Sequence, residues 1–179
     1  RLYREPADID DIAVPATPDP FIAVCFRGHR LIEGRDGEGP WRRAEIGTSC
    51  IFVRPAGESA ELRWRSLSDE PVDTAHLHLS SALLHDVAAR TADRDPAHVH
   101  LLNVFARRDP IVEAIAQGLV NELQRGSDAR LYADSAAQFL AVHLLRTHCS
   151  STYRIPDPRG RLDRRRLSRV LECIHAGTE

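Results

Sequence analysis

Methionine and lysine are both missing from this chain of 179 residues, so all 24 of its basic residues are arginine. Because there is no initiator methionine, we expect the sequence to be part of a longer protein. Cysteine is scarce, and Cys25, Cys50, Cys149 and Cys173 lie far apart without a CxxC pair. This spacing argues against a disulfide framework and is typical of reduced thiols in a cytoplasmic protein.

Long apolar runs and an excess of positive charge are also missing. The longest apolar stretches are a few residues, whereas a membrane-spanning helix needs about 20, so we expect no membrane partner. The net charge of -2 argues against a stand-alone nucleic-acid-binding protein, which is usually basic. The sequence contains no GxSxG, HExxH or glycine-rich phosphate-binding motif, so it assigns no catalytic residue and no cofactor.

The first half of the chain carries strand patterns. Short segments rich in β-branched and aromatic residues are separated by turns that contain glycine and proline. We predict strands at 21–27, 31–35, 50–54, 61–65 and 74–79. Several short strands at this spacing are typical of an antiparallel barrel or sandwich, and we assign residues 1–79 to such a unit.

From residue 80 onward the patterns become helical. A serine at position 80 or 81 can cap a first helix. Asp109-Pro110 combines an N-cap carboxylate with a proline at the first helical position, and Gly126 is placed to end that helix. A further helix is predicted from about residue 131 to 148. We assign residues 80–149 to a helical layer of the same domain.

The last part of the chain reads as a linker followed by the start of another domain. Residues 150–162 contain two prolines and no periodicity, as expected of a linker. One apolar stripe then marks an amphipathic helix, formed by Leu167, Val170, Leu171 and Ile174. No later segment is there to bury this stripe. We therefore expect 163–179 to be the first helix of a truncated domain.

Three helical segments carry motifs that are specific in combination. Residues 107–111 read RRDPI and precede GLVNEL, residues 131–136 read LYADSA and precede LAVHLLR, and residues 167–175 read LSRVLECIH. In this order they resemble helices of the AraC/XylS family of transcriptional regulators. The last of them resembles the helix that opens the family's helix-turn-helix DNA-binding domain.

The resemblance implies an α+β fold, with a cupin-like antiparallel β-barrel followed by a helical layer. It also implies a function that is not enzymatic: the effector-sensing or dimerisation domain of a DNA-binding regulator. The expected partners are promoter DNA, through the missing C-terminal domain, a small-molecule effector and a second copy of the chain. No DNA-contacting residue is assigned, because the arginine-rich run at 161–169 reads best as a solvated flank of the linker.

Barrel mouths are common binding sites for small molecules, which makes the aromatic residues of the barrel candidates. We predict an effector site lined by Phe26, Trp41, Phe52, Trp64, His76 and His78. The alternative for the aromatic residues is that they only fill the core.

Two alternative functions stay open. His76 and His78 share one face of a strand and could ligate a metal in a small cupin-type metalloenzyme. That site also needs a carboxylate and a third histidine, so we expect no metal there and favour hydrogen-bonded histidines. The other alternative is a dimerisation module without a ligand.

The helix predicted at 131–148 is apolar on more than one side, because Phe139 and Val142 lie outside its main stripe. A helix of this kind is normally buried on most sides. We predict a homodimer through the helical layer, with Phe139, Val142 and Leu145 at the two-fold seam.

Overall fold

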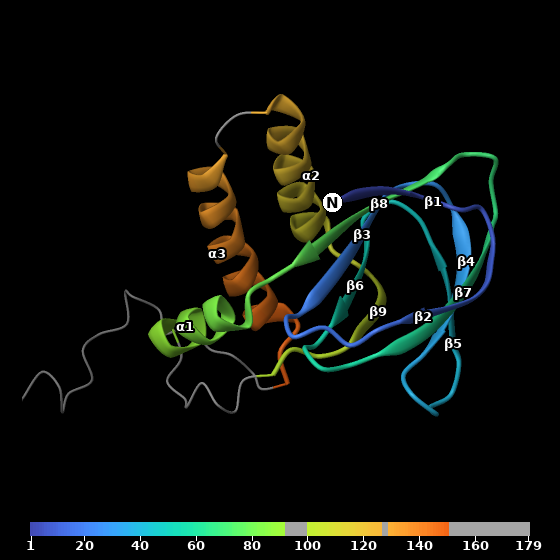
Figure 1. Ribbon diagram of the computed structural model, residues 1–179, viewed down its shortest axis with the longest axis horizontal. Helices are drawn as coiled ribbons and strands as arrows, with labels where there is room; N and C mark the ends of the chain where they lie inside the picture. Colours follow the sequence, from blue (N-terminus) through green and yellow to red (C-terminus); the bar gives the residue numbers. More distant parts are fainter. Residues whose placement is uncertain (92–99, 127–128, 151–179) are drawn as a thin grey trace, which may run out of the picture.

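The computed structural model describes residues 1–91, 100–126 and 129–150. The helix expected within 163–179, almost all of the linker and the arginine-rich run at 161–169 fall outside these ranges. Figure 1 shows two β-sheets facing each other, with a layer of helices against one of them.

Eight of the nine described strands follow one another along the chain, and the ninth comes after the first helix. They are β1 (Leu2–Glu5), β2 (Ile9–Val14), β3 (Phe21–Arg27), β4 (Arg30–Arg35), β5 (Arg42–Ile46), β6 (Cys50–Arg54), β7 (Ala60–Ser66), β8 (Val72–His78) and β9 (Val104–Arg108). The predicted strands correspond to β3, β4, β6, β7 and β8. The structure adds β1, β2, β5 and β9, which the sequence patterns did not indicate.

The strands form two antiparallel sheets. The helix-facing sheet has the order β1-β8-β3-β6-β9, and the distal sheet has the order β2-β7-β4-β5. Between them lies an apolar core with members from both sheets, among them Cys25, Ile32, Ile46, Cys50, Trp64 and Val72. The predicted α+β fold, a cupin-like barrel with a helical layer, is confirmed.

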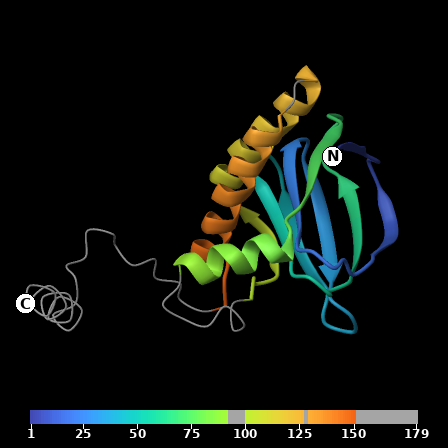
Figure 2. The ribbon, with the colours of Figure 1, turned by 60° about the vertical axis from the view of Figure 1, so that its left-hand side comes forward.

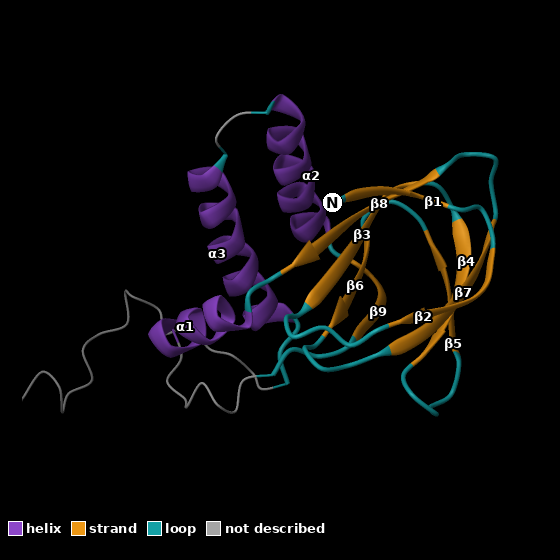
Figure 3. Ribbon diagram, in the orientation of Figure 1, coloured by secondary structure: helices purple, strands orange, loops and turns teal. Residues whose placement is uncertain are grey.

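The helical layer covers the outer side of the helix-facing sheet (Figures 2 and 3). It consists of α1 (Ser81–Thr91), α2 (Pro110–Arg125) and α3 (Arg130–Thr147). Helix α2 begins and ends as predicted: the Asp109 carboxylate accepts hydrogen bonds from the first-turn N–H groups, and Gly126 ends the helix at φ 65°. None of the described helices is long and apolar enough to cross a membrane.

The inner strands β3 and β6 of the helix-facing sheet are largely buried on both sides, and this shows the direction of their side chains. On β3, Ile22 and Val24 pack against the helices, whereas Cys25 packs toward the distal sheet. On β6, Ile51 and Val53 likewise face the helices. Because neighbouring residues of a strand point to opposite faces, the residues between them face the barrel interior. Strands buried on both faces therefore read as continuous apolar runs.

The chain returns to the barrel after α3. Leu101 and Cys149 form an isolated antiparallel bridge, flanked by hydrogen bonds from the Leu102 N–H to the His148 carbonyl and from the Ser150 N–H to the His100 carbonyl. The segment before β9 and the segment after α3 are thus held together by backbone pairing.

Candidate functional site

Two arginine side chains are buried in the barrel without complete hydrogen bonding. Arg30 on β4 is 6% exposed and Arg54 on β6 is 9% exposed, and the Nε and Nη1 atoms of both lack a hydrogen-bond partner. Burial lowers the pKa of both guanidinium groups. Arginine is rarely buried without a partner, because removing a charge from water costs several kcal/mol. Such a group marks a place where an anion would be stabilised.

Arg54 lines a small pocket at one end of the barrel. Its register partner on β3 is Phe21, and Phe52 and Phe105 meet edge to face with their ring centroids 5.3 Å apart. Leu62 from the distal sheet adds to this apolar wall. The free volume is about 10 Å³, which is room for roughly one water molecule. The pocket therefore places a guanidinium with two unpartnered nitrogen atoms beside an aromatic lining. Its free volume is too small for an organic molecule.

A polar network lies at the mouth of this pocket. The Arg42 guanidinium donates to Asp36 at 2.5 Å, and the Asn103 amide donates to Asp36 at 3.2 Å and to Glu58 at 2.9 Å. The Arg42 guanidinium also lies 4.8 Å from the centre of the Phe105 ring. The two carboxylates of the network raise the pKa of Arg54 through space, against the larger effect of burial. Asp36 and Glu58 accept their hydrogen bonds from Arg42 and Asn103 and not from Arg54.

Arg30 has a different environment at the opposite end. Its guanidinium lies 4.7 Å from the centre of the Trp64 ring, whose Nε1–H donates to the Pro6 carbonyl at 3.0 Å. The Glu5 carboxylate accepts a hydrogen bond from the Thr74 hydroxyl at 2.7 Å. Hydrogen bonding to His76 is the main cause that lowers the pKa of Glu5. Glu5 is thus held by these two neighbours and leaves Arg30 without a direct hydrogen bond.

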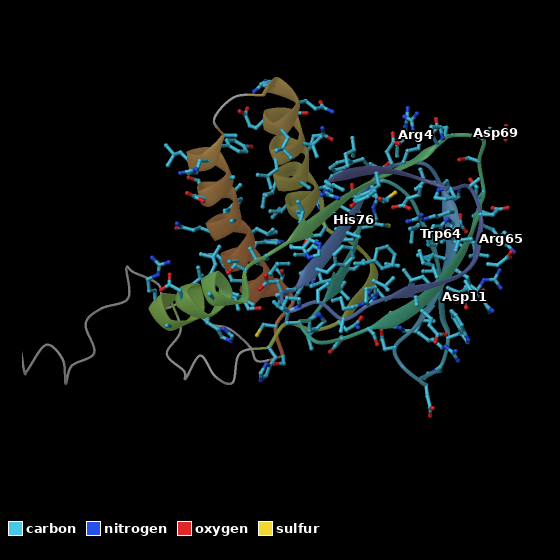
Figure 4. The ribbon with its side chains drawn as sticks, in the orientation of Figure 1. Arg4, Asp11, Trp64, Arg65, Asp69 and His76 are labelled. Atoms are coloured by element: carbon cyan, nitrogen blue, oxygen red, sulfur yellow. The ribbon has the colours of Figure 1, made fainter. Side chains whose placement is uncertain are left out.

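A cleft of about 750 Å³ opens beside the Arg30 end, between the β1–β2 and β7–β8 connections. Figure 4 shows Arg4 and Asp69 together at this end of the barrel. The charged residues that line the cleft are mostly acidic: Arg4, Glu5, Asp8, Asp69 and Glu70. This excess of carboxylates repels an anion, so the Arg54 pocket is the better anion site.

The structure brings four of the six residues predicted to line the effector site to the barrel side of their sheets. Trp64 and Phe52 belong to the core between the sheets. His76 and His78 face the same side as Phe21, with ring centroids 5.0 Å and 5.4 Å from the Phe21 ring. In the register of the sheet, His78, Phe21 and Arg54 form one row.

The other two predicted residues lie elsewhere. Phe26 packs against the helix-side core, because it alternates on β3 in step with Ile22 and Val24. Trp41 lies between the guanidinium groups of Arg35 and Arg63, at 4.9 Å and 4.3 Å from its ring centre. Arg63 alternates with the core residues of β7, so Trp41 lies on the outer face of the distal sheet.

The histidine pair on β8 does not gather a set of metal ligands among the described residues. His76 lies 3.4 Å from Glu5 and 3.3 Å from the Thr74 hydroxyl, whereas His78 is exposed. Within the ranges that the structure describes, one group of three potential ligands does form, and it lies in the helical layer: Asp109, His143 and His148. This group was not predicted from the sequence.

In that group, both imidazole rings are hydrogen-bonded to the same carboxylate oxygen. The Nε2 atoms of His143 and His148 lie 2.8 Å and 3.0 Å from Asp109 Oδ2. Burial acts to raise the pKa of Asp109, but hydrogen bonds from the two histidines and from the Val112 N–H outweigh it, and the pKa is lowered. The only signal in the sequence was the N-cap role of Asp109, because the histidines are 34 and 39 residues away.

Comparison with known proteins gives a likeness of fold. No family model matches the sequence, and no curated protein does. Among solved structures, apo ToxT from Vibrio cholerae matches with a TM-score of 0.51 and 15% identity, over 80% of this chain and 52% of that one. ToxT from strain O395 bound to (E)-4-(8-methylnaphthalen-1-yl)but-3-enoic acid matches with a TM-score of 0.50 and 15% identity, over 96% and 64%.

This chain shares its fold with ToxT. A structure of the AraC-like transcriptional activator CuxR also matches, with a TM-score of 0.47 and 13% identity over 89% of this chain and 51% of that one. The chain therefore spans between 51% and 64% of the length of these solved structures. At this level of identity, the likeness concerns the arrangement of barrel and helices.

Proposed function

We propose that this chain is the effector-sensing and dimerisation part of a DNA-binding transcription regulator, and that its barrel binds a small organic anion at Arg54. The fold shared with ToxT and the order of the helical motifs support the regulatory role. The observation that carries the choice of ligand is the buried guanidinium of Arg54, whose Nε and Nη1 atoms lack a hydrogen-bond partner beside an aromatic lining.

The chemistry of the pocket favours a carboxylate attached to an apolar body. A carboxylate can accept two parallel hydrogen bonds from a guanidinium, and this pairing strengthens where water is excluded. An aromatic or alkenyl body would pack against Phe21, Phe52 and Phe105. The ligand in one of the matching ToxT structures is a naphthalenyl butenoic acid, which combines these two features.

Binding requires the mouth of the pocket to open, because the present free volume of about 10 Å³ holds no organic molecule. The network of Asp36, Arg42, Glu58 and Asn103 is the barrier. Arg54 and Phe52 alternate on β6 with Ile51 and Val53, which pack against the helices. A ligand that shifts β6 would therefore move the contacts of the helical layer, which couples the barrel to the helices.

The experiment that tests this proposal is a titration of the purified chain with aryl-alkenoic acids and their primary amides, read by calorimetry. We expect acids to bind and amides to bind at least about tenfold more weakly, because a hydrogen bond to a charged group contributes about 1.5–3 kcal/mol. Arg54→Met should weaken the acid to the level of the amide. Arg43→Met, which changes an exposed arginine of β5, is the matched control. Equal affinity for acid and amide would refute an anion site.

We further propose that the second copy of the chain binds to the helical layer. Large apolar side chains are exposed there, with Phe139 at 55%, Leu123 at 69% and Leu131 at 80%. Of the residues assigned to the seam, Leu145 is fully buried in the helix-side core and Val142 is partly buried against it. Phe139 is therefore the residue on which the proposed dimer contact is centred.

Phe139→Asp is expected to convert the dimer into a folded monomer, because a charge at a two-fold seam meets its own copy. Sedimentation velocity at roughly tens of micromolar, where an association of about −6 to −7 kcal/mol is visible, measures the change. Gln138→Asp, which adds the same charge at the neighbouring exposed position, should remain dimeric. A monomeric unmodified chain under these conditions would contradict the dimer proposal.

The remaining parts of the proposal follow from the same role. The regulator binds promoter DNA through a further domain, acts in the cytoplasm and is not an enzyme. A metalloenzyme centred on His76 and His78 is disfavoured, because these two histidines and Glu5 do not form a close group of three ligand atoms among the residues with described positions. The unpaired Arg54 likewise favours a ligand-binding barrel over a dimerisation module without a ligand.

A further inference from the structure

The place where α2 begins and α3 ends holds three side chains with metal-ligating atoms. Asp109 precedes α2, His143 lies in the last part of α3, and His148 follows the helix directly. Their ligand atoms all lie within 4.8 Å of one another. The site is well removed from the surface: His148 is 2% exposed, Asp109 is 7% exposed, and the side chain of His143 is 12% exposed.

The Asp109 side chain and the backbone of His148 are fixed in position by other contacts. The Oδ1 atom of Asp109 accepts hydrogen bonds from the N–H groups of Ile111 and Val112, which leaves Oδ2 to face the histidines. The N–H of His148 donates to the Leu144 carbonyl, and its Nδ1 atom is buried without a partner. The rings therefore turn their Nε2 atoms toward one carboxylate oxygen and toward each other.

We propose that Asp109, His143 and His148 bind a divalent transition-metal ion of the zinc class. Two imidazole nitrogens and one carboxylate oxygen are the ligands that zinc accepts, at about 2.0–2.2 Å each. In a tetrahedral site these bond lengths place neighbouring ligand atoms about 3.3 Å apart. The two hydrogen-bonded pairs, at 2.8 Å and 3.0 Å, need to open by only a few tenths of an ångström.

Metal binding replaces the proton that each ring now shares with the carboxylate. Zinc binds neutral imidazole rings, so a ring whose single hydrogen now lies on Nε2 shifts that hydrogen to Nδ1, and a ring that carries two hydrogens releases one to solvent. The two Nε2 atoms and Oδ2 then bind the ion. A fourth ligand would be a water molecule that reaches the ion from the side of His143, whose side chain is the most exposed of the three. The ion would connect the residue before α2 to the residue after α3. No metal site was expected from the sequence, so the group of Asp109, His143 and His148 departs from that expectation.

The test is metal binding by the whole chain after treatment with a chelator. We expect one Zn²⁺ per chain by calorimetry and by elemental analysis, together with an increase in Tm that is lost on adding the chelator. Co²⁺, used as a coloured substitute, should give the strong visible absorption of a tetrahedral site without a thiolate charge-transfer band. This spectrum of the unmodified chain tests the ligand set without any variant.

Variants then assign the ligands. His143→Gln and His148→Gln keep an N–H that can donate to Asp109 but remove the imidazole, so each is expected to fold and to lose stoichiometric binding. His85→Gln, at an exposed histidine of α1, should bind as the unmodified chain does. Cys149→Ser should also bind normally. Absence of a bound ion in the unmodified chain, retention of binding in both glutamine variants, or loss of it in Cys149→Ser would each overturn the proposal.

Discussion

Arg54→Met is expected to raise the free energy of unfolding of the ligand-free chain by about 1–4 kcal/mol, the gain seen when buried charged groups are replaced by apolar ones of similar volume. Arg54 is 9% exposed, and two of its nitrogen atoms have no hydrogen-bond partner. Methionine has a similar length and packs readily among aromatic rings. Urea denaturation monitored by circular dichroism, with no ligand added, measures the difference.

The same variant is expected to lose organic-acid binding, so stability and function should change in opposite directions. Arg43→Met should change neither, because Arg43 is exposed on β5. A decrease in stability in Arg54→Met would show that the guanidinium contributes to the fold in the absence of a ligand. The anion proposal would then lose the observation on which it depends.

Asp109→Ala is expected to lower the free energy of unfolding by about 2–4 kcal/mol, measured by denaturation in the presence of a chelator. The loss of an N-cap costs about 1 kcal/mol, and the loss of a charge-assisted hydrogen bond costs about 1.5–3 kcal/mol. Asp109 makes both kinds of contact, to the first turn of α2 and to the histidines at the end of α3. One substitution therefore loosens two helices.

Asp109→Asn separates the two contributions. Asparagine keeps an oxygen for the cap but lacks the charge that the histidines favour, so its cost should be smaller than that of alanine. We expect the order unmodified, asparagine, alanine in decreasing stability. A loss of less than about 0.5 kcal/mol in the free energy of unfolding for Asp109→Ala is typical of surface substitutions. That result would show that Asp109 does not stabilise the contact between α2 and α3.

The elements that could be predicted are those whose sequence pattern is set by burial. Strands β3 and β6 are covered on both faces and read as apolar runs, and α2 carries its own start and stop signals in Asp109 and Gly126. Strands β1 and β2 are mostly exposed, with no buried residue, so no alternation marks them. Their positions are decided by pairing with β8 and β7, and these strands lie far from them in the sequence.

The candidate sites were partly predictable for the same reason. Strand alternation places His76 and Phe52 on the barrel side of their sheet. It places Phe26 on the helix side with Ile22 and Val24, and the prediction missed this because it rested on residue type and not on position along β3. Arg54 carried no signal, since an arginine at the end of a strand normally reaches solvent. The Asp109, His143 and His148 group needs the packing of α3 against α2, which no local pattern encodes.

The backbone bridge between Leu101 and Cys149 has a mechanical consequence. A pull on the chain beyond Ser150 loads the two hydrogen bonds beside the bridge before it can unwind α3. The force then passes through Leu101 into β9, which is paired with β6. The path from the exit of the domain to the strand that carries Arg54 is therefore a few residues long, and the helical hairpin is bypassed. A displacement of the chain after Ser150 would therefore shift β9 and β6, and with them the Arg54 pocket.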